Sequence, residues 1–107
     1  MTTFDDRNKA FENKYAHDKE IDFKVQARTT KLLALWAAGL LGMTEADATH
    51  YATQMVETNL EKTGIEDVVK RIAMDFHAKD VRMTDRDIRD ELERKQTLAR
   101  EQLMSGT

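Results

Sequence analysis

The stretch "LLALWAAGLL", from Leu32 to Leu41, is the longest apolar run of the chain and decides its fold class. It is far shorter than the ~20 apolar residues that a membrane-spanning helix needs. Gly42 follows it directly and is a good stop for a helix. No proline interrupts the chain back to Phe4, because the protein contains no proline at all. We therefore predict one long helix over residues 4–41.

The second half of this helix carries apolar residues every three to four positions, which is the spacing of a single buried face. A lone tryptophan within so apolar a run is expected in the core rather than stacked on a bound base. The residues assigned to the buried face are Ile21, Val25, Leu32, Leu35, Trp36 and Leu40, with Phe23, Ala27, Ala34 and Leu41 widening it.

Three further helices are predicted toward the C-terminus. Thr3, Thr44 and Thr84 are each followed three residues later by an aspartate, a capping-box arrangement that opens the first, second and fourth helices. The third helix is expected over residues 66–77, after Gly64 ends the second. The side chains expected to pack inward are those of Ala48, Tyr51, Ala52, Met55, Val56, Leu60, Val68, Val69, Ile72, Met74, Phe76, Val81, Met83, Ile88, Leu92, Ala99 and Leu103.

No segment alternates apolar and polar residues as a strand would, and short connections make sequential helices antiparallel neighbours. The chain is therefore predicted to be all-α, a small four-helix bundle with a long first helix. At 1.5 Å per residue that helix is ~57 Å long, about twice the length of the later ones. Its first twenty residues should project beyond the bundle. The expected division is an N-terminal arm over residues 1–18, a four-helix domain over 19–104 and a frayed tail over 105–107.

Composition excludes several classes of protein. The net charge of −3 argues against a nucleic-acid binder, which normally shows a basic face. The absence of cysteine removes disulfides and thiolate metal sites, as suits a reducing cytoplasm. Asp5 and Asp6 stand where a secretory signal would be basic and then apolar, so no signal peptide is predicted.

The chain offers little that could carry out catalysis or hold a cofactor. It has no phosphate-binding glycine loop and a single serine, which lies in the tail. A metal site needs clustered ligands, and His17, His50 and His77 are never one helical turn apart. We therefore expect no enzyme activity, no cofactor and no metal.

The N-terminal arm is too polar to be core, yet it carries three aromatic residues. Phe4, Phe11 and Tyr15 are spaced by seven and four residues, which puts them on one helical face. Burying all three would yield ~5–9 kcal/mol, and ordering fifteen residues costs at least that, at ~1–2 kcal/mol each. We therefore expect the arm to be mobile in the free protein and to dock as a helix in a partner's groove. The alternative of a tail with incidental aromatics stays open at this point.

The residues from Phe4 to Gly42 read "FDDR..AFE.K.AHD.E..FK..AR...LL.LWAA.LLG", with dots at the positions that are not used in the comparison. This block resembles the ATPase inhibitor subunit zeta family of alphaproteobacterial F-type ATP synthases. Two later blocks also fit, "YA...V" from Tyr51 and "G.EDVV.....D" from Gly64. The resemblance covers nearly the whole chain and is strongest in its first 42 residues.

The resemblance implies a four-helix domain, here residues 19–104, that carries an inhibitory N-terminal segment and anchors it from outside. In the family this segment enters a catalytic α/β interface of the ATPase head, beside the γ subunit, and blocks rotation in the direction of hydrolysis. The implied partners are the α, β and γ subunits, and the implied location is cytoplasmic, peripheral to the inner membrane. The positions that carry the inhibitory role over to this chain are Phe4, Asp5, Asp6, Arg7, Ala10, Phe11, Glu12, Lys14, Tyr15, Ala16, His17 and Asp18.

Two other functions are compatible with the residues alone. One is a helical adaptor that acts in another assembly. The other is a nucleotide-sensing regulator with a pocket between helices, lined by Trp36 and by a basic residue such as Arg28 or Lys31. The missing glycine loop argues against tight nucleotide binding in that second case.

Overall fold

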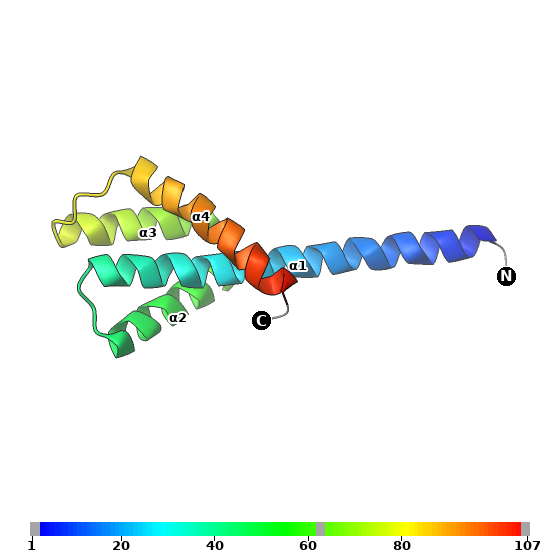
Figure 1. Cartoon of the computed structure of the whole chain (residues 1–107), viewed down its shortest axis with the longest axis horizontal. Helices are drawn as coiled ribbons and strands as arrows, with labels where there is room; N and C mark the ends of the chain where they lie inside the picture. The colour runs from blue at the N-terminus through cyan, green and yellow to red at the C-terminus, as the bar shows by residue number, and fades with distance from the viewer. Residues whose placement is uncertain (1–2, 62–63, 106–107) are drawn as a thin grey trace.

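The computed structural model describes the backbone of residues 3–61 and 64–105, and the side chains of residues 20–59 and 64–105. Four α-helices follow one another over this part of the chain, and it contains no strand. Their bounds are α1 Thr3–Leu40, α2 Glu45–Glu61, α3 Ile65–Ala78 and α4 Asp85–Met104. The predicted all-α, four-helix architecture is therefore confirmed (Figure 1).

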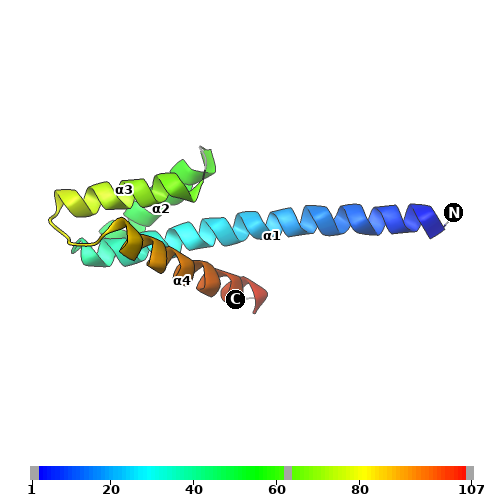
Figure 2. The same ribbon diagram turned by 90° about the horizontal axis from the view of Figure 1, so that it is seen from above.

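The first helix is much longer than the other three. It has 38 residues, whereas α2, α3 and α4 have 17, 14 and 20. Both ribbon views show the three shorter helices gathered around the C-terminal half of α1, while its N-terminal half runs on alone (Figures 1 and 2). The molecule therefore measures 65 Å along one axis and only 24 and 23 Å along the others.

Helix ends coincide with the capping signals that the sequence contains. Gly42 has φ +77°, a left-handed conformation that glycine adopts without a steric penalty. The amide of Gly42 donates to the carbonyl of Gly39, and that of Met43 donates to Ala38, which forms a Schellman motif at the end of α1. Thr84 makes a complete capping box with Asp87 at the start of α4. The cap predicted at Thr3 lies outside the described side chains.

The core is one cluster to which all four helices contribute. Most of the inward positions predicted for the later helices are confirmed, although Leu103 is only half-buried. The buried ones include Met55 of α2, Val68, Val69, Ile72 and Phe76 of α3, and Ile88, Leu92 and Ala99 of α4. Trp36 is partly buried and meets Phe76 edge to face, with ring centroids 5.7 Å apart. The side chains that form the centre of the core are Leu33, Ala34, Ala37, Ala38, Tyr51, Ala52, Met55, Val68, Val69, Ile72, Phe76, Ile88 and Leu92.

The buried face of α1 differs from the prediction. Leu40 is 41% exposed and Phe23 is 56% exposed, so assigning them to the buried face was wrong. Periodicity could not choose the face, because residues 32–41 are apolar almost all the way round the helix. Within this run the buried side carries Leu33 and three alanines, Ala34, Ala37 and Ala38. The buried residues of α1 that the pattern missed are Thr29, Thr30, Leu33, Ala37 and Ala38.

Met74 was also assigned to the core, and it is 71% exposed on the outer side of α3. The buried residues of that helix, Val68, Val69, Ile72 and Phe76, follow one stripe. Met74 lies two residues from both Ile72 and Phe76, and positions two apart point in very different directions on a helix. Its apolar character alone was not enough to place it in the core.

A carboxylate is buried where α4 packs, and the sequence did not indicate it. Glu91 is only 9% exposed. Its two oxygens are held by Arg94 at 2.8 Å and Lys95 at 3.0 Å, both from the same helix. Burial alone would raise the pKa of Glu91, but the hydrogen bonds from Lys95 and Arg94 outweigh it and hold that pKa below its ordinary value.

Candidate functional site

All of the residues predicted to inhibit lie in the N-terminal half of α1. The backbone of this segment is helical, and the ribbon views show no other helix beside it (Figures 1 and 2). The side chains before Glu20 lie outside the described residues. The shared face of Phe4, Phe11 and Tyr15 therefore stays a prediction, as do the individual roles of the charged positions between them.

The described structure begins at the root of the arm, where α1 enters the bundle. Glu20 and Lys24 form an exposed ion pair of 3.2 Å one turn apart. Val25 is the first buried side chain among the described residues. The buried hydroxyl of Thr29 donates a hydrogen bond of 2.7 Å to the backbone carbonyl of Val25. The hydroxyl of Thr30 accepts a hydrogen bond of 3.1 Å from the side-chain amide of Asn59. Of these contacts, the one between Asn59 and Thr30 joins two helices and ties this part of α1 to α2.

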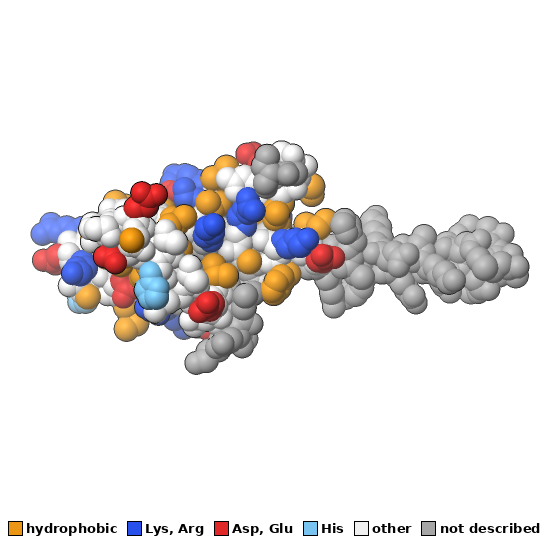
Figure 3. All heavy atoms as spheres, turned by 90° about the horizontal axis from the view of Figure 1, so that it is seen from below, with side chains coloured by type: hydrophobic (Ala, Val, Ile, Leu, Met, Phe, Trp, Pro, Cys, Tyr) orange, Lys and Arg blue, Asp and Glu red, His pale blue; other side chains and the backbone are white. Residues whose placement is uncertain are grey.

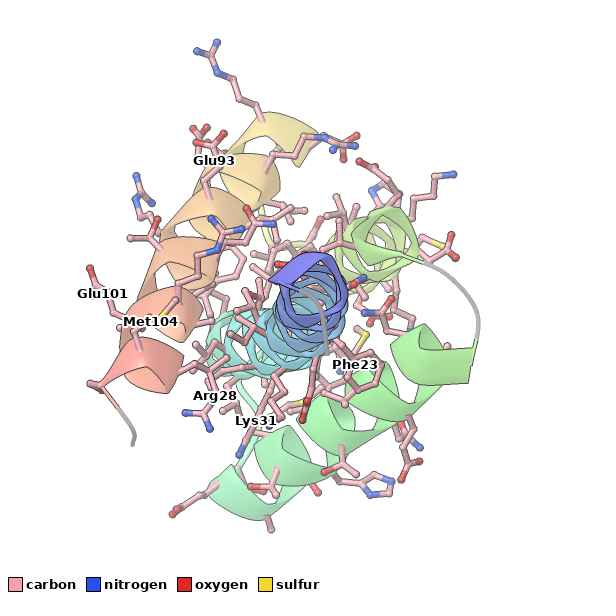
Figure 4. The ribbon with its side chains drawn as sticks, turned by 90° about the vertical axis from the view of Figure 1, so that its right-hand side faces the viewer. Phe23, Arg28, Lys31, Glu93, Glu101 and Met104 are labelled. Carbon is pink, nitrogen blue, oxygen red and sulfur yellow. The ribbon has the colours of Figure 1, made fainter. Side chains whose placement is uncertain are left out.

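An open groove lies beside this root, between α1, α2 and the last turn of α4. Its volume is about 340 Å³. Figure 4, which looks along α1 from the arm, shows Phe23, Arg28 and Lys31 on the side of α1 that faces this groove. We call it the root groove, and it is lined by Phe23, Lys24, Ala27, Arg28, Lys31, Val56 and Leu103.

Basic and apolar side chains alternate around the root groove. On this face of the molecule hydrophobic side chains lie among lysines and arginines, close to where the arm leaves the bundle (Figure 3). Arg28 donates a hydrogen bond of 3.1 Å to Gln102 of α4, which fixes its guanidinium at the edge. A second groove of about 590 Å³ between α1 and α2 shares Lys31 and Val56 with the first, so the surface is continuous.

This groove was not predicted from the sequence. Phe23 was assigned to the core, and the basic residues Lys24, Arg28 and Lys31 were not considered together. Their spacing of four and then three residues puts them on one helical face, which is a signal that could have found them.

The described residues do not form the nucleotide pocket predicted between Trp36 and a basic residue. Trp36 borders a cavity whose other residues include Asp87, Asp90 and Glu91, and these carboxylates repel phosphate groups. The two basic residues suggested for that pocket line the root groove instead.

Neither a metal site nor a membrane-spanning helix is present among the described residues. His50 and His77 are exposed on different helices. Within residues 20–59 and 64–105 no three His, Cys, Asp or Glu side chains are grouped closely enough to hold a metal ion. The described helices also include none with the length and apolar character needed to cross a bilayer.

Comparisons with known proteins agree with this architecture. A solved structure, titled as the solution NMR structure of a protein, is similar with a TM-score of 0.68 and 32% sequence identity. The similarity covers 81% of this chain and 99% of that one. No curated protein matches the chain. The family model described as ATPase inhibitor subunit zeta matches residues 1–102. The chain therefore belongs to the ATPase inhibitor subunit zeta family, whose name is that of a regulatory subunit rather than of an enzyme.

Proposed function

We propose that this protein inhibits ATP hydrolysis by an F-type ATPase, and that it does so by inserting residues 1–18 into a catalytic α/β interface of the head. The observation that carries the proposal is the first helix, which extends far beyond the bundle in a chain of an inhibitor family. A segment that its own domain does not cover is available to a partner.

The proposed mechanism is steric. A catalytic interface must close and open during each turnover, and a helix wedged in it prevents both movements. Phe4, Phe11 and Tyr15 would fill apolar pockets of the interface. The charged positions between them would pair with groups at its rim and set the register of the helix.

The continuity of α1 supports this mechanism. The same helix that carries the arm contributes Leu33, Ala34, Ala37 and Ala38 to the centre of the core. An arm that continues a formed helix does not have to nucleate a helix of its own, which is the unfavourable step. It is also joined through one continuous helix to a folded body that would resist the movement of the interface.

Steady-state ATP hydrolysis by the cognate ATPase, with and without the full chain, tests the proposal. Added protein should lower the rate to a small residual value. Phe11→Ala removes one predicted anchor from the arm and should weaken inhibition without lowering the unfolding midpoint. Met74→Ala is the matched control, because it removes an exposed apolar side chain from α3. Equal inhibition by Phe11→Ala and Met74→Ala would contradict the role assigned to Phe11.

A further inference from the structure

A buried threonine of α1 fixes the orientation of an asparagine on α2. The hydroxyl of Thr30, which is fully buried, donates a hydrogen bond of 2.9 Å to the carbonyl of Gln26. A hydroxyl has a single hydrogen to donate, so toward Asn59 the Thr30 oxygen acts only as an acceptor. The Asn59 group that lies 3.1 Å from it is therefore the amide nitrogen, because exchanging the amide nitrogen and oxygen would bring two acceptors together.

This orientation leaves the side-chain oxygen of Asn59 in need of another partner. The oxygen is buried, and it accepts no hydrogen bond from any group in the described part of the chain. Leaving a buried acceptor unpaired is unfavourable. Groups of this kind in folded proteins are bonded either to the protein or to ordered water.

A small cavity between α2 and α3 has Asn59 in its wall. Its volume is about 40 Å³, and it is lined by Met55, Thr58, Asn59, Asp67, Val68 and Arg71. Met55 and Val68 are buried, whereas the three polar residues other than Asn59 are exposed, so the cavity has an apolar floor and a polar rim. A water molecule needs only ~10–15 Å³ of such volume. The cavity is therefore large enough for water, and it is far smaller than the pockets that bind organic ligands.

The groups around the cavity favour a neutral molecule that both donates and accepts hydrogen bonds. The oxygen of Asn59 requires a donor, which an anion does not supply. The wall carries one carboxylate, Asp67, and one guanidinium, Arg71, so it selects neither sign of charge. Arg71 pairs with Asp75 through Nε at 3.5 Å, and its guanidinium carries further N–H donors. Water meets both requirements.

We propose that this cavity binds one ordered water molecule, which donates a hydrogen bond to the side-chain oxygen of Asn59 and accepts one from Arg71. The water then joins the end of α2 to the first turns of α3. Because the amide nitrogen of Asn59 is bonded to Thr30, the water completes a chain of hydrogen bonds that runs from α1 through α2 to α3.

A direct contact between the same two helices shows what the water adds. The hydroxyl of Tyr51 donates a hydrogen bond of 2.6 Å to Asp75 of α3. Tyr51 precedes Asn59 by about two helical turns on α2. With the water in place, polar contacts hold α3 against α2 at two separated positions rather than at one.

NMR spectroscopy of the full-length protein tests the proposal. Cross-peaks from the nuclear Overhauser effect should connect the water resonance with the methyl groups of Met55 and Val68. Their sign should equal that of the diagonal, which identifies water that stays bound while the molecule tumbles. The methyl groups of Ile88, which is fully buried in the core, are the internal control and should give no such cross-peak. Absence of the cross-peaks at both Met55 and Val68 would overturn the proposal.

Two variants test whether Asn59 holds the water. Asn59→Leu removes the acceptor and should abolish the cross-peaks of both methyl-bearing residues. Thr58→Val is the matched control, because it removes only a hydroxyl of the rim, and it should keep them. Cross-peaks of full intensity in Asn59→Leu would contradict the proposal. Their loss in Thr58→Val would do so too, because they would then have come from the Thr58 hydroxyl proton.

A third variant covers the case in which Asn59→Leu does not fold. Val68→Ile adds one methylene group to the floor of the cavity and should displace the water. The cross-peak between water and the Met55 methyl group should then disappear, whereas its survival at full intensity would show that the water lies outside the cavity.

Discussion

Leu33 and Leu40 lie two helical turns apart in the same apolar run, yet their surroundings are opposite. Leu33 is fully buried in the core cluster, whereas Leu40 is 41% exposed. Leu33→Ala should lower the free energy of unfolding by about 2–5 kcal/mol, because it leaves a cavity among packed neighbours. Leu40→Ala should cost about 1 kcal/mol or less, because its surroundings already include water. Chemical denaturation measures both, and equal costs would contradict the observed face of α1.

Glu91 makes the stability of the bundle depend on pH. Its pKa in the folded protein is below the ordinary value of 4.5, so the unfolded chain binds a proton more readily than the folded one. The ion pairs therefore stabilise the fold above that ordinary value, and the stabilisation is lost as the pH falls through the lowered folded pKa. Glu91→Gln should destabilise the protein at pH 7 and have progressively less effect below about pH 4.5.

Glu93→Gln is the control for this substitution, because Glu93 is an exposed residue of the same helix. It should change the unfolding midpoint little at either pH. Thermal unfolding of both variants at pH 7 and pH 3 makes the comparison. A constant difference between Glu91→Gln and the unchanged protein across this range would show that the ion pairs do not contribute as described.

At the scale of the helices, the sequence predicted most of the fold. Prolines are absent, and Gly42 and Gly64 with Thr44 and Thr84 mark the helix boundaries to within a few residues, because capping is a local property of the chain. The buried faces of α3 and α4 were also predictable, since polar residues flank each apolar stripe. The buried face of α1 was not predictable, because periodicity cannot distinguish the sides of a helix whose residues are almost all apolar.

The candidate site was predictable only in part for a related reason. The arm is identified by its local composition and by its length against the later helices. The root groove is built from Phe23 and Lys31 of α1, Val56 of α2 and Leu103 of α4. No spacing along one helix reveals that side chains from three helices meet. The only local indication of the root groove was the helical spacing of its basic residues on α1.

The end of α3 is capped in the same way as the end of α1. The amide of Val81 donates to the carbonyl of Phe76 at 2.8 Å, and that of Asp80 donates to His77 at 3.2 Å. This is again a Schellman motif, but Asp80 occupies the left-handed position with φ +60°. Asp80→Gly should stabilise the protein by about 0.5–1 kcal/mol, because it relieves the backbone and removes an anion from a helix C-terminus. A lower unfolding midpoint for Asp80→Gly would contradict this account of the turn.

On the scale of the whole molecule, one helix serves two purposes. The C-terminal half of α1 supplies the centre of the core, and its N-terminal half extends away from the other three helices (Figure 2). We therefore expect the bundle to fold without the arm, and the arm to depend on the bundle for its helical start and its position. This asymmetry predicts that inhibition and folding can be separated by truncation.

The most direct test of the central claim removes residues 1–18 and leaves the rest of the chain unchanged. The truncated protein should unfold at nearly the same temperature as the full chain, because Val25 is the first buried side chain of the described part. It should also leave steady-state ATP hydrolysis by the cognate ATPase uninhibited at concentrations where the full chain inhibits completely. Full inhibition by a folded truncated protein would contradict the account, because the inhibitory surface would then lie on the bundle rather than on the arm.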